Sequence, residues 1–321
     1  MKGLVLALAM VASGTALAGE LQQQARALFG AAPQQQPEPA QVALGRTLFF
    51  ESRIGQDGKT SCGSCHNAAN GGADGRKLAL GAFGRQAPRN TPTIVDVTGQ
   101  VAYHWTGNRS SLADQAKKAL TAPPAYAHPD LASAEARLRS LTDLAPAFAR
   151  AFPGEPMGAD TFARAIEAYQ QSLVTRSRFD DFLAGDEGAL DEQERRGLAT
   201  FISVGCVSCH NGRNLGGGSF QKFGVFADYW TLTGSQQVDE GRARDSGQEA
   251  DRQVFKVPPL RHVAKTAPYF HDGSVAKLDE AVAIMARLQL NRSLSERQVA
   301  DIVAFLGAVT APMPAALSPP Q

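Results

Sequence analysis

The sequence has no excess of charge of either sign and no apolar run long enough to span a membrane. Its 32 lysine and arginine residues and 31 aspartate and glutamate residues give a net charge of +1 at pH 7. This balance does not indicate nucleic acid or an anionic membrane as a partner. Signals for β-strands are also few and short. These absences favour a mainly α fold with long loops.

Cysteine is scarce, and none lies outside two Cys-x-x-Cys-His motifs. The motifs contain Cys62, Cys65 and His66, and Cys206, Cys209 and His210. This spacing matches the attachment site of a c-type haem, where both thiols add to the haem vinyl groups and the histidine binds the iron. Two disulfides, a thioredoxin-like redox pair and half-sites for zinc are the alternatives. Neither motif has a thioredoxin-like context, and zinc would leave both histidines unexplained. We therefore predict two covalently bound haem c groups.

The first 18 residues have the features of a secretory signal peptide. Lys2 precedes the apolar run Leu4–Val11, and Ala16–Ala18 offers small residues for cleavage. The run is too short to span a membrane and remain there. The sequence therefore predicts a signal peptide over residues 1–18 and a mature protein in a bacterial periplasm, where covalent attachment of haem also takes place.

The chain repeats one pattern around its two haem motifs. His66 and His210 are 144 positions apart (210 − 66), and the similar segments Ala43–Phe49 and Arg196–Phe201 precede them. Each segment indicates a short helix that leads into a haem loop. We predict two related class I cytochrome c-like haem domains, over residues 42–187 and 188–310, with the boundary near Gly185–Asp191. Residues 19–41 would form an N-terminal segment that ends in an extended Gln- and Pro-rich stretch, Ala31–Gln41, and residues 311–321 a flexible tail.

Three further helices are predicted from periodicity and capping. Asp160–Phe182 has apolar residues at helical spacing, with Asp160 as a candidate N-cap, and Leu278–Leu288 has the same periodicity. Ser295–Gln298 forms a capping box that opens a last helix, which extends to about Val309.

Other segments form a series with the two motifs. They are Leu48–Phe50, Pro88–Thr93, Trp105–Gln115, Phe255–Pro258 and Thr266–Val275. In this order, these segments resemble the bacterial di-haem cytochrome c peroxidase family, which includes MauG, the enzyme that matures methylamine dehydrogenase. The resemblance covers most of the chain, from about Leu44 to Val309. It implies that the N-terminal haem is the peroxide site and that the C-terminal haem takes electrons from a small donor.

The resemblance also implies the iron ligands. His66 and His210 match the proximal histidines of the family. Met285, which lies 14 residues after His271 (285 − 271), matches the second axial ligand of the C-terminal haem. A thioether ligand favours ferrous iron and raises the reduction potential, as a haem that accepts electrons requires.

Roles for other residues follow from the same resemblance. Trp105 matches the tryptophan between the haems, where it relays electrons, and Gln115 matches a residue that lies over the peroxide. Arg109 is expected to meet a haem propionate, and His271 to hydrogen-bond close to a haem. The implied ligands of an inter-haem calcium ion are Asn90 and the main-chain carbonyls of Thr266 and Pro268.

The chain departs from the family pattern around the peroxide site. Ala82 occupies the position of the distal histidine, so we expect an open or water-bound iron site even in the oxidised protein. Ala125 occupies the position of a glutamate that assists the splitting of peroxide. Tyr126 and His128 are candidates to replace its proton transfer, although plain loop roles remain the alternative for both. The cation of the family's Trp-Asp-Gly-Arg segment is shifted by one position, to Arg109.

The leading hypothesis is a periplasmic oxidoreductase that reduces hydrogen peroxide to water at the N-terminal haem. Electrons would come from a small cytochrome c or a copper protein and enter through the C-terminal haem. One alternative is MauG-like oxidation of a residue on a partner protein. This alternative is favoured by Ala82 but opposed by Met285, since MauG has a tyrosine there. The other is an electron carrier or haem sensor without catalysis, which Ala125 would suit. Relatives are often dimers, so a homodimer is a further expectation.

Overall fold

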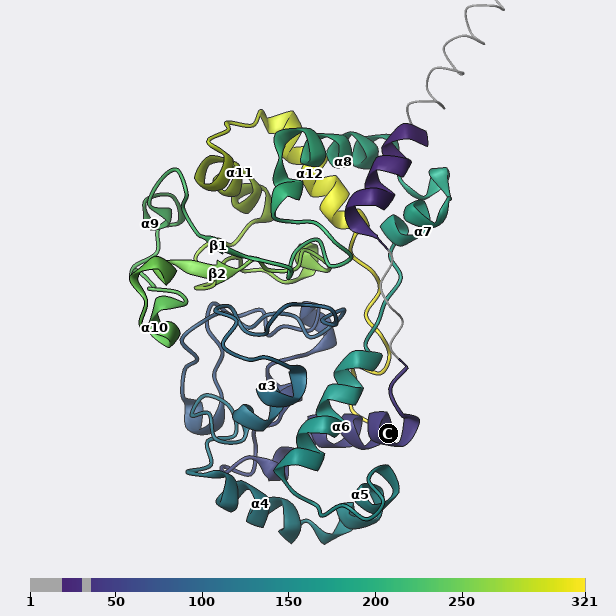
Figure 1. Cartoon of the computed structure of the whole chain (residues 1–321), viewed down its shortest axis with the longest axis vertical. Helices are drawn as coiled ribbons and strands as arrows, with labels where there is room; N and C mark the ends of the chain where they lie inside the picture. The colour runs from purple at the N-terminus through teal and green to yellow at the C-terminus, as the bar shows by residue number, and fades with distance from the viewer. Residues whose placement is uncertain (1–18, 31–35, 321) are drawn as a thin grey trace, which may run out of the picture.

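The computed structural model describes residues 19–30 and 36–320, so the predicted signal peptide lies outside the described residues. The described chain is mainly helical with long loops, as predicted, and forms two lobes stacked along the long axis (Figure 1). Its α-helices are α2 (Pro39–Phe50), α3 (Leu112–Ala119), α4 (Leu131–Ser140), α5 (Ala145–Ala151), α6 (Ala159–Ser172), α7 (Arg178–Ala184), α8 (Glu192–Val204), α9 (Tyr229–Thr233), α10 (Ala243–Ser246), α11 (Leu278–Leu290) and α12 (Glu296–Ala308). None of the helices in this described part is long and apolar enough to cross a membrane.

In the N-terminal lobe, α2 crosses α6 in close contact. A Cβ at Gly45 of α2 would lie 1.9 Å from the carbonyl oxygen of Ala165, so only glycine permits this approach. One turn later, the ring of Phe49 lies 5.1 Å from that of Tyr169 and 6.4 Å from that of His66. The helix crossing therefore forms a wall beside the first haem motif.

The C-terminal lobe repeats this arrangement with α8 and α12. A Cβ at Gly197 of α8 would lie 1.8 Å from the carbonyl oxygen of Asp301. The ring of Phe201 lies 5.4 Å from that of Phe305 and 6.4 Å from that of His210. Both helices that were expected to lead into the motifs are present, and both cross a partner helix at a glycine. The two lobes are thus related in structure as well as in sequence.

The chain crosses between the lobes before the predicted boundary near Gly185. Leu173, directly after α6, lies in the core of the N-terminal lobe, whereas Phe179 and Phe182 of α7 lie in the core of the C-terminal lobe. The helix expected over Asp160–Phe182 is therefore broken. The cause is local: Ser177 is an N-cap that starts a new helix at α7.

Residues 19–29 were predicted as a segment that precedes the first domain. They are helical, and they pack in the core of the C-terminal lobe. Ala25 and Phe29 are fully buried, and the ring of Phe29 meets that of Phe179 edge-on at 5.3 Å. The predicted extended stretch, Ala31–Gln41, is partly wrong: residues 31–35 lie outside the described residues, but α2 already begins at Pro39.

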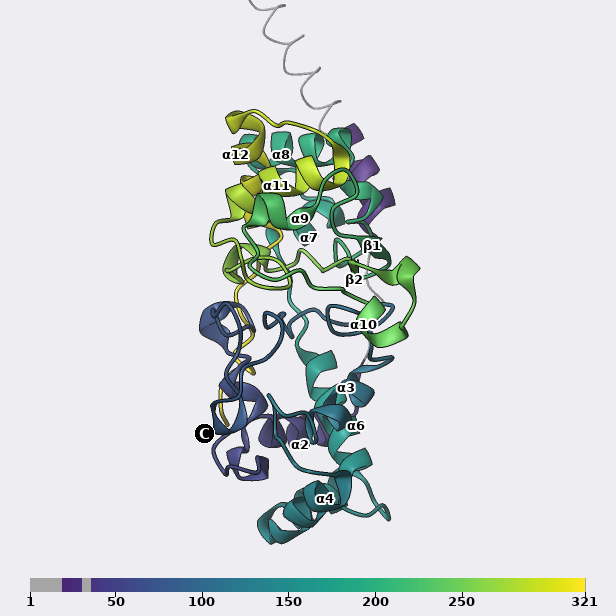
Figure 2. The ribbon, with the colours of Figure 1, turned by 90° about the vertical axis from the view of Figure 1, so that its left-hand side faces the viewer.

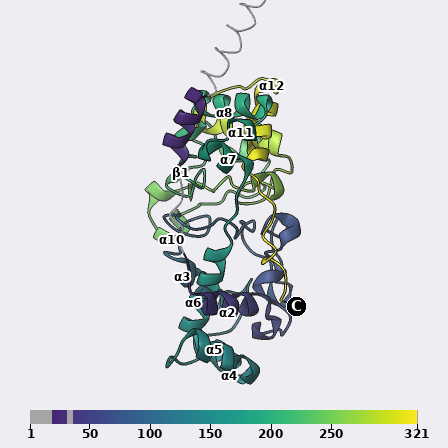
Figure 3. The ribbon, with the colours of Figure 1, turned by 90° about the vertical axis from the view of Figure 1, so that its right-hand side faces the viewer.

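The final segment is not a flexible tail over residues 311–320. After α12 it returns along the molecule to the N-terminal lobe, as the side views in Figures 2 and 3 show. Leu317 is 2 % exposed within the N-terminal core. The hydroxyl of Tyr169 donates to the carbonyl of Ala316 at 2.9 Å, and Arg46 donates to the carbonyl of Ser318 at 2.9 Å. Proline content alone did not reveal this docking.

The only sheet in the described chain is one antiparallel pair, β1 (Phe220–Lys222) and β2 (Val254–Lys256), at the junction of the lobes (Figure 1). Its edge is tied to the N-terminal lobe, because the main-chain N–H of Lys256 donates to the carbonyl of Trp105 at 2.8 Å. Beyond the sheet, α11 and α12 confirm two of the helices predicted from sequence, and Ser295 forms the expected capping box with Gln298.

Candidate haem and peroxide site

Each Cys-x-x-Cys-His motif folds into a short 3₁₀ turn, Cys62–Ser64 in one lobe and Cys206–Ser208 in the other. The Nδ1 atoms of His66 and His210 lie 2.9 Å from the carbonyl oxygens of Gly72 and Leu215, respectively. A carbonyl only accepts, so each Nδ1 carries the proton and each Nε2 keeps its lone pair for a metal. Both imidazoles are therefore arranged as iron ligands.

The pKa values of the motif residues favour haem attachment over a redox-active cysteine pair. Burial lowers the pKa of His66 and His210, which keeps both rings neutral as ligands must be. Burial also raises the pKa of Cys62 and Cys206 to about 11, opposite to the depressed pKa of a thioredoxin-like thiol. All four cysteines are free, so neither pair forms a disulfide.

One continuous cavity of about 610 Å³ joins the two motifs. It has the size of a typical cofactor pocket, and its wall is mostly apolar side chains with a few polar groups. The residues present thus fit two covalently attached haem groups. The cavity brings together most of the residues singled out from the sequence, namely Cys62, Cys65, His66, Asn90, Trp105, Gln115, Cys206, Cys209, His210, Thr266, Pro268, His271 and Met285.

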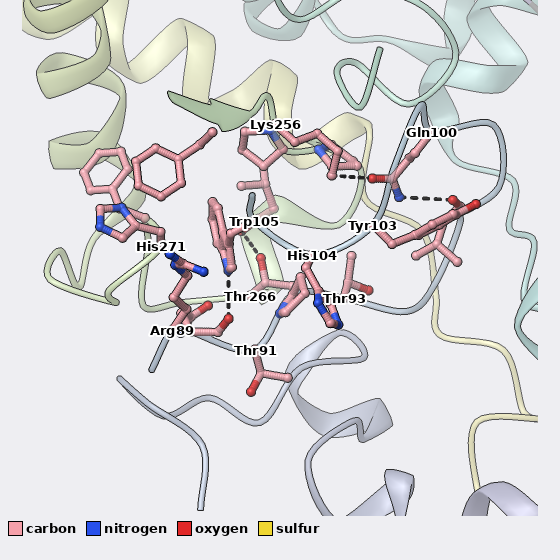
Figure 4. A pocket seen from close by; sticks show the side chains of 18 of the residues that line it. Arg89, Thr91, Thr93, Gln100, Tyr103, His104, Trp105, Lys256, Thr266 and His271 are labelled. Atoms are coloured by element: carbon pink, nitrogen blue, oxygen red, sulfur yellow. Dashed lines mark hydrogen bonds between the residues drawn. The ribbon is translucent and has the colours of Figure 1, made fainter. Parts of the chain in front are cut away.

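Trp105 stands on the wall of this cavity where the lobes meet (Figure 4). Its indole N–H donates to the carbonyl of Asn90 at 2.8 Å, and its own carbonyl accepts from the main-chain N–H of Lys256 at 2.8 Å. Its ring meets that of His271 edge-on at 6.4 Å. These contacts from both lobes fix the aromatic ring between the two haem motifs.

His271 is buried beside Trp105 in a cluster of rings. It stacks on Phe255 at 4.4 Å, and its Nε2 lies 3.9 Å from a carboxylate oxygen of Asp239, which in turn pairs with Arg89. Burial lowers the pKa of His271. Its Nε2 has no hydrogen-bond partner in the described protein, whereas its main-chain carbonyl accepts from the N–H of Asn90 at 2.7 Å.

The three candidate calcium ligands line the same cavity. The amide nitrogen of Asn90 donates to the carbonyl of Arg76 at 2.8 Å, which leaves Oδ1 as an acceptor. Thr266 and Pro268 follow on the facing segment of the C-terminal lobe. Within residues 19–30 and 36–320, no group of three or more His, Cys, Asp or Glu side chains is arranged to hold a metal. Calcium therefore stays a prediction based on neutral oxygens.

Around the first motif, Gln115, Ala125 and Tyr126 line the cavity together with His66. Tyr126 is 2 % exposed, its Oη lies 3.2 Å from Sγ of Cys62, and burial raises its pKa so that it stays protonated. His128, the other candidate for proton transfer, is not on the wall, because its Nε2 lies 2.7 Å from the carbonyl of Ile54.

Two residues expected at the site are not on the cavity wall. Ala82 is fully buried, and its N–H donates to the carbonyl of Ala125 at 3.2 Å. Ala82 and Ala125, the two positions where the resemblance predicts a departure from the family pattern, are thus neighbours. Arg109 pairs with Asp114 at 3.4 Å, and its Nε is buried without a partner. Its expected role at a propionate stays a prediction.

Sequence reasoning missed several polar groups on the wall. Arg89, Gln100 and Lys256 line the cavity, and Arg89 forms an ion pair with Asp239. Arg89 and Lys256 fall within the segments that carried the resemblance, but nothing in a linear pattern shows that a lysine is buried. The only signal was that Lys256 interrupts an otherwise apolar strand.

Comparisons with known proteins decide the family. A model of the di-haem cytochrome c peroxidase family matches residues 39–188. The chain is 40 % identical to the cytochrome c551 peroxidase of Pseudomonas aeruginosa over 94 % of its own length and 90 % of that protein. The chain belongs to the di-haem cytochrome c peroxidase family. It is therefore an oxidoreductase, and the family implies two haem c groups and hydrogen peroxide as a substrate.

Two other relatives show how broad this similarity is. The methylamine utilization protein MauG of Methylorubrum extorquens is 32 % identical over 88 % of this chain and 81 % of its own. The crystal structure of a MauG-like protein associated with microbial copper homeostasis matches with a TM-score of 0.76 and 28 % identity, covering 91 % of this chain and 95 % of that one. The resemblance seen in the sequence is confirmed, and so is the fold class.

Proposed function

We propose that the protein is a periplasmic peroxidase that reduces hydrogen peroxide to water at the haem of His66. Electrons enter at the haem of His210 and Met285, supplied by a small cytochrome c or copper protein. The observation that carries this proposal is the continuous cavity, which contains both motifs and Trp105 between them. Haem iron, when bound, supplies the binding and reductive cleavage of peroxide.

The two lobes supply different groups to the cavity. Met285 of α11 lies on the wall with His210 and is the proposed second ligand there. The N-terminal lobe adds Gln115, Ala125 and Tyr126 to the wall, none of which iron commonly takes as a neutral ligand. His104 also lines the cavity, and its Nδ1 lies 2.9 Å from Oδ1 of Asn108. A haem iron held by His66 would be open to peroxide if no other side chain binds it, as Ala82 at the distal position suggests, and Gln115 would orient the peroxide by hydrogen bonding.

Proton supply is the weak part of this site, since Ala125 has no acidic group. Tyr126 offers a buried hydroxyl on this wall, although its Oη lies 3.2 Å from Sγ of Cys62, the atom that would carry the haem. We therefore expect slow peroxide turnover compared with relatives that carry glutamate at this position.

A second candidate function is peroxide-driven oxidation of a residue on a partner protein. Ala82 favours it, because a protein without a distal histidine needs no prior reduction. Both functions use the same peroxide site and differ in the reductant.

The test is rapid mixing of the fully oxidised protein with stoichiometric hydrogen peroxide. We expect peroxide to be consumed without prior reduction. Consumption only after one-electron reduction would show that another ligand closes the iron, and no consumption in either state would favour a pure electron carrier. Trp105→Phe is the matched variant: it should leave peroxide binding unchanged and slow electron delivery from the reduced C-terminal haem.

A further inference from the structure

Lys256 carries a buried positive charge beside the haem cavity. It is the last residue of β2, only 6 % exposed, and its side chain lines the cavity next to Trp105 (Figure 4). Its ammonium donates to Oε1 of Gln100 at 2.6 Å, the single partner that the structure gives it. Burial lowers its pKa to about 8, which reflects the cost of a charge without an anion nearby.

The two arginines that line this cavity are neutralised by carboxylates. Arg261, 1 % exposed, pairs with Asp180 at 2.6 Å. Arg89 pairs with Asp239 at 2.7 Å. Lys256 meets only a neutral amide, although buried charges in proteins are normally paired. The comparison indicates that an anion outside the polypeptide completes the site of Lys256.

Two contacts hold the side chain of Gln100 in place beside Lys256. Its amide nitrogen donates to the carbonyl of Val97 at 3.0 Å, which turns Oε1 toward Lys256. On the opposite side, Gly217 packs so closely that a Cβ there would lie 2.7 Å from Cγ of Gln100. The amide is therefore fixed, and Lys256 keeps two of its three ammonium hydrogens for another acceptor.

We propose that Lys256, positioned by Gln100, binds a carboxylate, and that this carboxylate is a propionate of a covalently attached haem. The cavity that Lys256 lines runs between the two haem motifs, and propionates are the anionic groups that a haem brings into it. Because the main chain of Lys256 also holds the carbonyl of Trp105, one residue ties a haem edge to the aromatic ring between the lobes. The inference rests on the haem groups and not on peroxide turnover.

The test is spectroelectrochemical titration of both haems in the holoprotein with Lys256→Met. Without the cation, the propionate charge is uncompensated and stabilises ferric iron. We expect the potential of one haem to fall by about 59 mV, a tenfold change in its one-electron equilibrium. Lys222→Met is the matched control, since Lys222 lies exposed on the partner strand β1, and Lys256→Arg should restore the potential.

Two results would overturn the proposal. One is unchanged potentials in Lys256→Met with both haems attached. The other is a wild-type potential that varies with acetate concentration at constant ionic strength, because the site would then hold a free anion. If Lys256→Met does not retain haem, Lys256→Gln is measured instead by resonance Raman spectroscopy. The propionate bending band of one haem should shift, and a band identical to wild type would contradict the assignment.

Discussion

The two lobes hold their haem motifs in the same way and differ on the remaining walls of the cavity. Each has a glycine at a helix crossing, an aromatic ring 6.4 Å from the motif histidine and a carbonyl 2.9 Å from its Nδ1. The C-terminal lobe then adds the thioether of Met285, while the N-terminal lobe adds Gln115, Ala125 and Tyr126. The mode of attachment is thus shared, and under the proposed function the opposing side chains determine which haem reacts with peroxide.

The largest expected effect tests whether the helix crossing requires glycine in both lobes. Gly45→Ala and Gly197→Ala each place a Cβ under 2 Å from a carbonyl oxygen, so each should lower the free energy of unfolding by about 3 kcal/mol. Gly307→Ala in α12 meets open space and should raise it by about 1 kcal/mol. Urea denaturation of the holoproteins measures all three. A loss of unfolding free energy in only one of the two glycine variants would contradict the similarity of the two helix crossings.

A second prediction concerns the acid that the proposed peroxide site of the N-terminal lobe does not have at residue 125. Ala125→Glu should accelerate peroxide consumption by about 100-fold, the usual range for a general acid or base. Ala125→Gln has nearly the same size without the acid and should give no such gain. Equal rates for both variants, measured by stopped-flow absorbance, would mean that residue 125 does not face the bound peroxide.

The core of the N-terminal lobe also includes a residue from the last segment, residues 311–320, whereas the core of the C-terminal lobe includes none. Leu317 is buried in the N-terminal core, so Leu317→Ala should lower the free energy of unfolding by about 2 kcal/mol. Pro320→Ala changes an exposed residue of the same segment and should have little effect. Denaturation curves of the two variants that coincide would contradict the docking.

The smallest expected effect concerns the loop before the first motif. Burial alone would raise the pKa of Asp57, but hydrogen bonds from Lys59, Thr60 and Phe83 lower it from 3.8 to about 2. A lowered pKa stabilises the fold above 3.8, and this contribution disappears as the pH falls through 2. Asp57→Asn should flatten the stability between these values. Urea midpoints of the variant that run parallel to wild type would show that the bonds do not form.

Much of the site could be predicted because its signals are local. The haem motifs and the capping box of Ser295 are short patterns whose chemistry does not depend on the rest of the fold. The docking of Leu317, the burial of Phe29 and the hydrogen bond from Lys256 to Gln100 depend on segments far apart in the sequence. A proline-rich end of a chain usually indicates a loose tail. Here the N-terminal core buries Leu317, and the sequence pattern alone does not show that the fold offers this position.

The central claim is that the two haems differ in their second ligand, and electron paramagnetic resonance of the oxidised protein tests it most directly. We predict one low-spin and one high-spin haem in the wild type, with the low-spin signal lost in Met285→Leu and the high-spin signal unchanged. A low-spin signal that persists in Met285→Leu, or a wild type with two low-spin haems, would contradict the account.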